Sequence, residues 1–120
     1  MSDGIIEIAA LRRLLEAIGG DPEDLRELIE DFRSEAPELA AQISEAAAGA
    51  DLESLRIAAH TLKSNARDFG ATRLSALCEE LEQDCRTGAV ADPGDRAEAI
   101  AAAETAARKA LGDLRTDEVL

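Results

Sequence analysis

The chain has 120 residues, 46% of them hydrophobic, with no Tyr or Trp and a formal net charge of −13. This length allows one domain with a buried core, and the composition favours helices. Because nucleic acid and anionic membranes would repel so acidic a protein, the charge argues against both as partners. No segment approaches the roughly 20 apolar residues of a membrane span. The N-terminus MSDGIIEIAA also lacks the character of a signal peptide, so a cytoplasmic location is expected.

The first predicted element is a short helix over about residues 4–18. Apolar residues from Ile5 to Ile18 recur at steps of three and four, which is typical of one helical face. The pair Gly19-Gly20 then ends the helix. We therefore expect a leading helix ahead of the main domain.

The second predicted helix begins at Asp21-Pro22, which supplies an N-cap and a proline at the first helical position. Its apolar stripe, from Leu25 to Ala46, keeps its phase through Pro37. We expect one long helix that bends at this proline. A break there is the alternative, since a proline inside a helix costs about 3 kcal/mol.

Three more helices follow in the same way. Asp51 is the predicted N-cap of the third helix, which ends at Gly70, and the fourth helix ends at Gly88. A second aspartate-proline pair, Asp92-Pro93, begins the last helix. The tail, residues 116–120, is expected to be frayed.

No segment alternates polar and apolar residues with a period of two, and short connections between helices indicate antiparallel neighbours. The sequence therefore predicts a single all-α domain over residues 1–120. Its architecture is an up-and-down antiparallel four-helix bundle over about residues 21–115 with an additional short N-terminal helix. A monomer is expected.

The two cysteines fall within one helical pattern. Cys78 and Cys85 are seven residues apart, or about 10 Å along a helix axis, which is too far for a disulfide. A metal site would need further ligands, and the only histidine lies elsewhere in the sequence. We therefore expect both cysteines to pack in the core, and we predict no metal site.

The third helix carries that histidine, His60, on its outer face. At about 100° per residue, His60 lies about 130° from the centre of the buried stripe, so its ring is predicted to be exposed. No Asp or Glu occurs between Ser54 and Arg67. The sequence thus predicts a local cationic patch around the histidine, whose neighbours on this face are Arg56, Lys63, Ser64 and Arg67.

These neighbours suit a histidine that accepts a phosphoryl group. Lys63 and Arg67 can place positive charge beside a phosphate. The same cations disfavour a protonated imidazole, so His60 would be a neutral nucleophile without a separate general base. Ser64 is small and leaves the approach to the ring open, and Ile57 is an exposed apolar contact for a partner. Taken alone, a surface histidine or a basic helix face is most often ordinary solvated surface.

The combination resembles the signature of histidine-containing phosphotransfer (HPt) domains of bacterial phosphorelays, written H-x-L-K-G with a hydrophobic-Gly pair further on. Here the segment reads AHTLKSNARDFGA over residues 59–71. A stretch Phe-x-x-x-Ala-Pro-Glu-Leu at residues 32–39 and a Leu-Cys-Glu-Glu-Leu-Glu run after Gly70 also resemble the family. The resemblance extends from about Asp21 to Leu114. Ser64 departs from the pattern, because the family most often has Gly there.

By this resemblance, His60 is the phosphorylated residue, Lys63 neutralises the phosphate, Ser64 provides clearance and Gly70 has a structural role. The chain would accept a phosphoryl group from a receiver-domain aspartate or a hybrid histidine kinase and pass it to another response-regulator aspartate. It would be a carrier and not an enzyme, with no ATP site or cofactor of its own, while the receiver supplies Mg²⁺. The partner-binding residues would be Arg56, Ile57, Ser64 and Arg67.

Two alternatives belong to other classes. One is a helical binding module that docks on a receiver or kinase and inhibits it without being phosphorylated. The intact His-Leu-Lys core argues against it, because a pure binder needs no accessible histidine flanked by cations. The other is an autonomous kinase or phosphatase, which is disfavoured because no glycine-rich phosphate loop is found.

Overall fold

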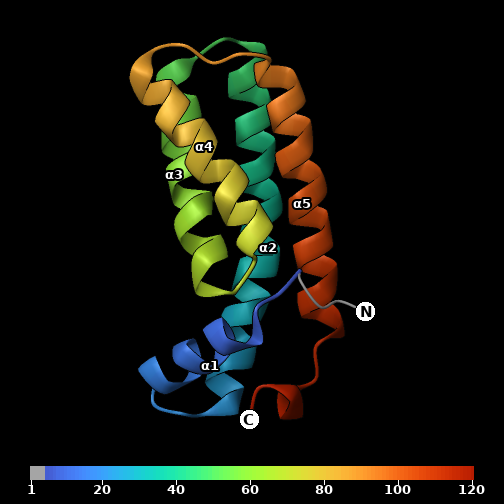
Figure 1. Cartoon of the computed structure of the whole chain (residues 1–120). Helices are drawn as coiled ribbons and strands as arrows, with labels where there is room; N and C mark the ends of the chain where they lie inside the picture. The colour runs from blue at the N-terminus through green and yellow to red at the C-terminus, as the bar shows by residue number, and fades with distance from the viewer. Residues whose placement is uncertain (1–4) are drawn as a thin grey trace.

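The computed structural model describes residues 5–120, in which all regular secondary structure is helical and no strand occurs. Five α-helices and one short 3-10 helix follow one another along the chain (Figure 1). The all-helical class predicted from the sequence is confirmed. The elements are α1 (Ile8–Ala17), α2 (Pro22–Ala48), α3 (Leu52–Asp68), α4 (Thr72–Thr87), α5 (Pro93–Asp113) and η1 (Thr116–Glu118).

The four long helices pack side by side around one apolar core (Figure 1). Helix α3 contacts α2 and α4, and helix α5 contacts the same two helices from the other side. Helix α1 lies across one end of this bundle, where it contacts α2 and α3. The outer face of the middle of α3 therefore remains free of the leading helix.

Aspartates occupy the N-cap positions of three helices, as the sequence predicts: Asp21 for α2, Asp51 for α3 and Asp92 for α5. The side chain of Asp21 accepts a hydrogen bond from the backbone of Glu23 at 2.9 Å, and Asp51 accepts one from Ser54 at 3.1 Å. Each bond satisfies a backbone N–H that has no partner within the helix. Asp92 differs, since its backbone is left-handed (φ 49°) and its side chain makes no capping bond. Helix α5 nevertheless begins at Pro93, as predicted.

Helix α2 is 27 residues long and contains Pro37 in its interior. The alternative prediction of a break at this proline is therefore wrong. Phe32 and Ala36 before the proline and Ala40 after it are all buried on the same face. Burial of this continuous stripe outweighs the cost of about 3 kcal/mol for an interior proline. One long helix is thus confirmed.

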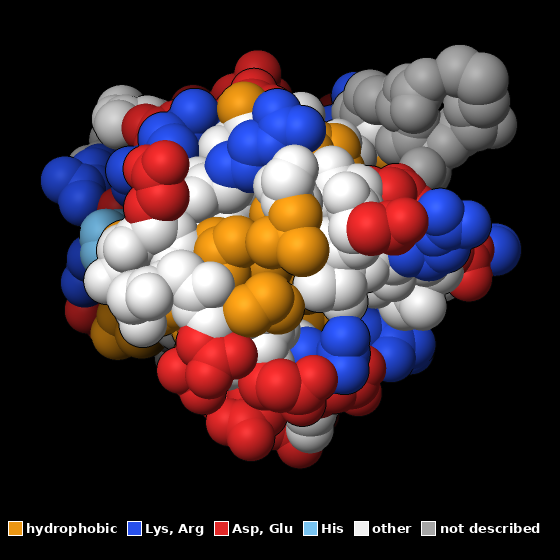
Figure 2. Space-filling view, turned by 90° about the horizontal axis from the view of Figure 1, so that it is seen from below, with side chains coloured by type: hydrophobic (Ala, Val, Ile, Leu, Met, Phe, Trp, Pro, Cys, Tyr) orange, Lys and Arg blue, Asp and Glu red, His pale blue; other side chains and the backbone are white. Residues whose placement is uncertain are grey.

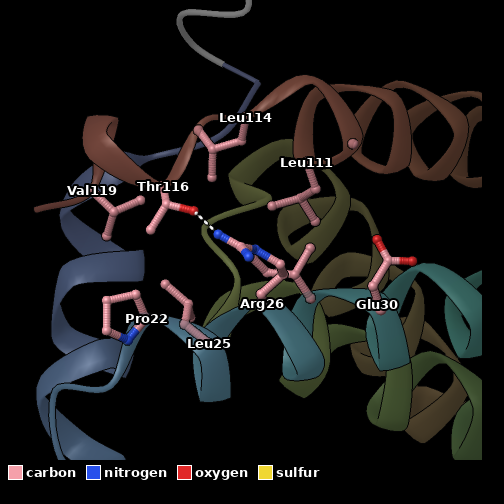
Figure 3. Close-up of a pocket in the computed structure, with 10 residues that line it drawn as sticks. Pro22, Leu25, Arg26, Glu30, Leu111, Leu114, Thr116 and Val119 are labelled. Atoms are coloured by element: carbon pink, nitrogen blue, oxygen red, sulfur yellow. Dashed lines mark hydrogen bonds between the residues drawn. The ribbon is translucent and has the colours of Figure 1, made fainter.

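The two ends of the chain differ from the predictions. Helix α1 begins at Ile8, and residues 1–4 lie outside the described part of the chain. The frayed tail is wrong, because Val119 is buried and its carbonyl accepts a hydrogen bond from Arg12 at 3.0 Å. Thr116 likewise accepts a bond from Arg26 at 2.7 Å, beside a pocket of about 240 Å³ (Figure 3). The partners of the tail are about 90 or more residues away in the sequence, where no local pattern reveals them.

Both cysteines are buried and free, as predicted. Burial raises the pKa of the Cys78 thiol to about 12, so the thiol stays protonated at neutral pH. A buried, protonated thiol is a small apolar side chain and a poor nucleophile. The cysteines therefore serve the packing of α4.

Gly70 joins α3 to α4 at the point where the N-terminal segment crosses. Its carbonyl accepts a hydrogen bond from the backbone N–H of Glu7 at 2.8 Å, and its φ is +75°. A Cβ at this position would lie 2.5 Å from the carbonyl oxygen of Glu7, which no real contact allows. Glycine is therefore required here both by the backbone conformation and by the close approach of a second chain segment.

We predict that Gly70→Ala lowers the free energy of unfolding by more than Gly88→Ala does. Both glycines have left-handed backbones, but a Cβ at Gly88 (φ +83°) meets nothing within 4 Å. The conformation alone costs a non-glycine residue about 1–2 kcal/mol, and only Gly70→Ala adds the collision with Glu7. Urea unfolding followed by circular dichroism measures both values. Equal losses would show that the contact with Glu7 contributes nothing.

Candidate functional site

His60 lies on the outer face of α3, with 53% of its side chain exposed. Its neighbours Ala59 and Leu62 are fully buried, which sets the orientation of the helix. The ring therefore occupies the outward position that the helical spacing predicts. Neither the core nor the leading helix covers it.

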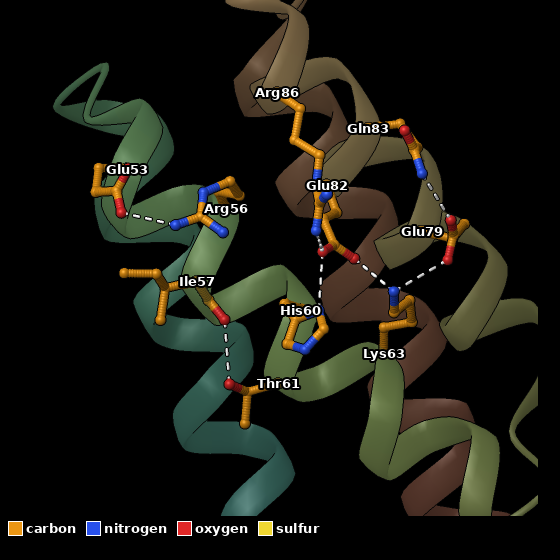
Figure 4. Close-up of polar contacts among 10 residues, drawn as sticks. All are labelled: Glu53, Arg56, Ile57, His60, Thr61, Lys63, Glu79, Glu82, Gln83 and Arg86. Carbon is orange, nitrogen blue, oxygen red and sulfur yellow. Dashed lines mark hydrogen bonds and ion pairs between the residues drawn. The ribbon is translucent and has the colours of Figure 1, made fainter.

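The ring is bound to a buried carboxylate on the neighbouring helix (Figure 4). Nδ1 of His60 lies 2.8 Å from Oε2 of Glu82 on α4, and only 1% of the Glu82 side chain is exposed. An ionised carboxylate can only accept hydrogen bonds, so Nδ1 carries the proton and donates it. In the neutral ring Nε2 is then the nitrogen with a free lone pair, on the side of the ring away from Glu82.

Glu82 is kept ionised by two cations from different helices. Nζ of Lys63 lies 2.6 Å from Oε1, and the Arg86 guanidinium donates to Oε2 at 2.8 Å. Burial alone would raise the pKa of Glu82, but its contacts with Lys63, Arg86 and His60 outweigh this effect and lower the pKa to about 2. The carboxylate is therefore charged at any physiological pH and holds the ring in one tautomer.

The prediction that only cations surround His60 is wrong, because a neighbouring helix contributes carboxylates. The stretch of α3 between Ser54 and Arg67 contains no Asp or Glu, but Glu79 and Glu82 of α4 lie beside it. The helical spacing of α3 carries no information about the side chains that a neighbouring helix contributes. The surroundings of the imidazole are a mixed network of acids and bases, and a carboxylate touches the ring.

Lys63 belongs to this network more than to the solvent. Only 12% of its side chain is exposed, and Nζ contacts Glu79 at 3.2 Å besides Glu82. The hydrogen bond with Glu82 is the main reason why the pKa of Lys63 is raised. The ammonium group thus binds two carboxylates of α4.

The other four predicted residues are spread along α3. Arg56 forms an ion pair with Glu53 at 2.7 Å, and Ile57 is 52% exposed. Ser64 is half-buried. Arg67 is exposed near the end of the helix, where it lines a groove with α1. Figure 2 shows that end of the molecule, with apolar side chains gathered at its centre among basic and acidic ones.

Sequence reasoning missed Glu82 and Arg86, and one signal for Glu82 was available. Cys78, Leu81 and Cys85 form the buried stripe of α4, and Glu82 falls on the same face. A charged residue on an apolar stripe is almost never fully buried unless it is paired. Arg86, at i+4 from Glu82, is one of its partners. The position of a buried carboxylate opposite the only histidine was therefore partly visible in the pattern.

Within residues 5–120, no three His, Cys, Asp or Glu side chains gather in a way that could hold a metal ion. In the same range, no helix combines the length and the apolar character needed to cross a membrane.

Comparison with known proteins identifies the family. The Hpt domain model matches residues 27–116, which include the His60 network. The crystal structure of histidine-containing phosphotransfer protein B from Pseudomonas aeruginosa PAO1 superposes with a TM-score of 0.82. It is 22% identical and covers 92% of this chain and 93% of its own, a likeness that shows the fold. No curated protein matches. Three quarters of the chain thus match one family, and the chain belongs to the Hpt domain family.

Proposed function

We propose that this chain is a phosphorelay intermediate that carries a phosphoryl group on Nε2 of His60. It accepts the group from a receiver-domain aspartate or a hybrid histidine kinase and passes it to another response-regulator aspartate. Membership of the Hpt family supports a phosphotransfer role. The observation that carries the assignment to His60 is its exposed ring, held by a buried carboxylate at Nδ1.

The chemistry of acceptance follows from the tautomer. The lone pair of Nε2 attacks phosphorus, the N–P bond forms, and the bond from phosphorus to the aspartate oxygen breaks with its electron pair returning to the carboxylate. The proton of the neutral ring sits on Nδ1, which donates it in a hydrogen bond to Glu82, so Nε2 has no proton that a base would have to remove. The chain presents the nucleophile, while Mg²⁺ in the receiver would stabilise the charge of the transferring group.

The roles of the cations follow from their positions. Lys63 holds Glu82 ionised and adds positive charge beneath the site, shielded from water. Arg86 is 55% exposed and shares Oε2 of Glu82 with the ring, so it is a second cation available to an incoming phosphate. Positive charge close to the ring opposes the roughly two negative charges of the phosphoryl group. We propose both residues for phosphate neutralisation.

The receiver would dock on the exposed face of α3. Ile57 offers an apolar contact beside the ring, and Arg56 and Arg67 offer charge on either side. Ser64, one turn after His60, is small enough to leave the ring accessible.

The substitution Ser64→Phe, which places a large side chain here, should slow phosphoryl transfer from a receiver domain while leaving His60 open to a small phosphodonor. Unchanged transfer would count against the clearance role.

We also propose that the four long helices form an up-and-down antiparallel bundle, which their ring of neighbour contacts supports. A monomer in the cytoplasm that binds no cofactor of its own completes the proposal. The alternative is a binding module that inhibits a receiver or kinase without being phosphorylated. Nothing in the site favours it, because docking alone does not require a buried Glu82 at the ring.

The central prediction concerns His60 itself. After incubation with a receiver domain that carries labelled phosphate, the wild type should become labelled and His60→Gln should not. Because His60 is the only histidine, no other imidazole can substitute for it. Gel autoradiography measures the label, and circular dichroism checks the fold of the variant. Binding to the receiver without any label on the wild type would support the inhibitory module instead.

A second prediction compares substitutions of the two lysines of the chain, Lys63 and Lys109. Lys63→Ala should lower the equilibrium yield of phosphorylated His60 by about tenfold, as the loss of one charge-assisted contact does. Without the Lys63 charge, the negative charge of Glu82 would no longer be balanced on this side and would repel the phosphate. Lys109→Ala is the matched control, since Lys109 is exposed and paired with Asp113 on α5. Equal yields in both variants, with unchanged helical circular dichroism, would exclude Lys63 from phosphate stabilisation.

A further inference from the structure

The contact between His60 and Glu82 affects the phosphorylated ring as well as the free one. A phosphoryl group on Nε2 leaves Nδ1 in one of two states. With its proton, the ring is positively charged; without it, the ring is neutral. Hydrogen bonding to a charged form stabilises that form, so the group that faces Nδ1 decides which state predominates.

Glu82 is the group that faces Nδ1, at 2.8 Å from Oε2. The other charged side chains around the ring are Arg56 and Lys63 on α3 and Glu79 and Arg86 on α4 (Figure 4). Within residues 5–120, no charged side chain of α1 or α2 forms a hydrogen bond or ion pair with the ring. Because the pKa of Glu82 is about 2, the carboxylate stays ionised wherever an imidazole titrates.

We propose that Glu82 retains the proton on Nδ1 of phosphorylated His60, so that the ring departs as a neutral imidazole in the next transfer. This inference rests on the phosphoryl-carrier function proposed above. The Nε2–P bond breaks and its electron pair returns to Nε2, while an oxygen of the receiver aspartate forms the new bond to phosphorus. The Nδ1 proton stays in place throughout. Without it the ring would leave as an anion, which is far more basic and leaves more slowly.

An amide at the same position would act in the opposite direction. The NH₂ group of a glutamine can donate a hydrogen bond to an unprotonated Nδ1 and stabilise the neutral phosphorylated ring. A carboxylate has no such proton and favours only the protonated ring. Glu82 would therefore make phosphorylated His60 a short-lived species that gives up its phosphoryl group readily, which suits rapid onward transfer.

The test compares the stability of phosphorylated His60 in the wild type and in Glu82→Gln. Both proteins are phosphorylated with phosphoramidate, a small-molecule donor, and the loss of the phosphoryl group is followed by phosphorus NMR from mildly acidic to alkaline pH. In the variant we expect a lifetime about tenfold longer at neutral pH, since a hydrogen bond to a charged group is replaced by one between neutral groups. Its rate of loss should fall further as the pH rises, whereas the wild-type rate should stay nearly constant across neutral pH.

Glu104→Gln is the matched control. Glu104 is also buried and also paired with an arginine four residues later, Arg108 at 2.9 Å, but it lies on α5 and makes no contact with His60. Its phosphorylated form should behave as the wild type does.

Identical lifetimes and pH profiles in the wild type and Glu82→Gln would overturn the inference while leaving the carrier function intact. Failure of the wild type to be phosphorylated at all would instead overturn the proposed function. If Glu82→Gln does not fold, a wild-type rate that falls steeply through neutral pH would by itself contradict the inference.

Discussion

The buried carboxylate of Glu82 is the interaction on which the geometry of the site depends. Removing a carboxylate from water costs several kcal/mol unless it is paired and hydrogen-bonded. Lys63 and His60 from α3 and Arg86 from α4 together supply the donors that offset this cost. The same contacts fix the imidazole in one tautomer and one orientation. One buried charge thus couples the packing of α3 against α4 to the reactivity of an exposed ring.

Much of the fold was predictable because its determinants are local. Aspartate-proline pairs, the phase of the apolar stripe in α2 and the glycine at the end of α3 all act within a few residues of their position. The long-range contacts were not predictable in this way. Val119 is held by Arg12, and Gly70 is covered by Glu7, each across a large gap in the sequence. Those contacts order the tail and dock the leading segment.

The site was predicted in part for the same reason. The outward position of His60 follows from the spacing of a single helix, and the motif around it pointed to the family that the comparison found. What the spacing of α3 could not show is that α4 places Glu82 against the ring and draws Lys63 away from the solvent. A prediction made helix by helix therefore described a basic patch, whereas the fold produces a network in which a buried acid orients the imidazole.

The most direct test of this account is to locate the phosphoryl group atom by atom. Because His60 is the only histidine, its two ring nitrogens give the only imidazole signals in a nitrogen-15 NMR spectrum of the phosphorylated protein. The account predicts coupling of phosphorus to Nε2, with Nδ1 on the side of Glu82 free of phosphate. Phosphorus attached to Nδ1, or an imidazole spectrum unchanged by phosphorylation, would contradict it.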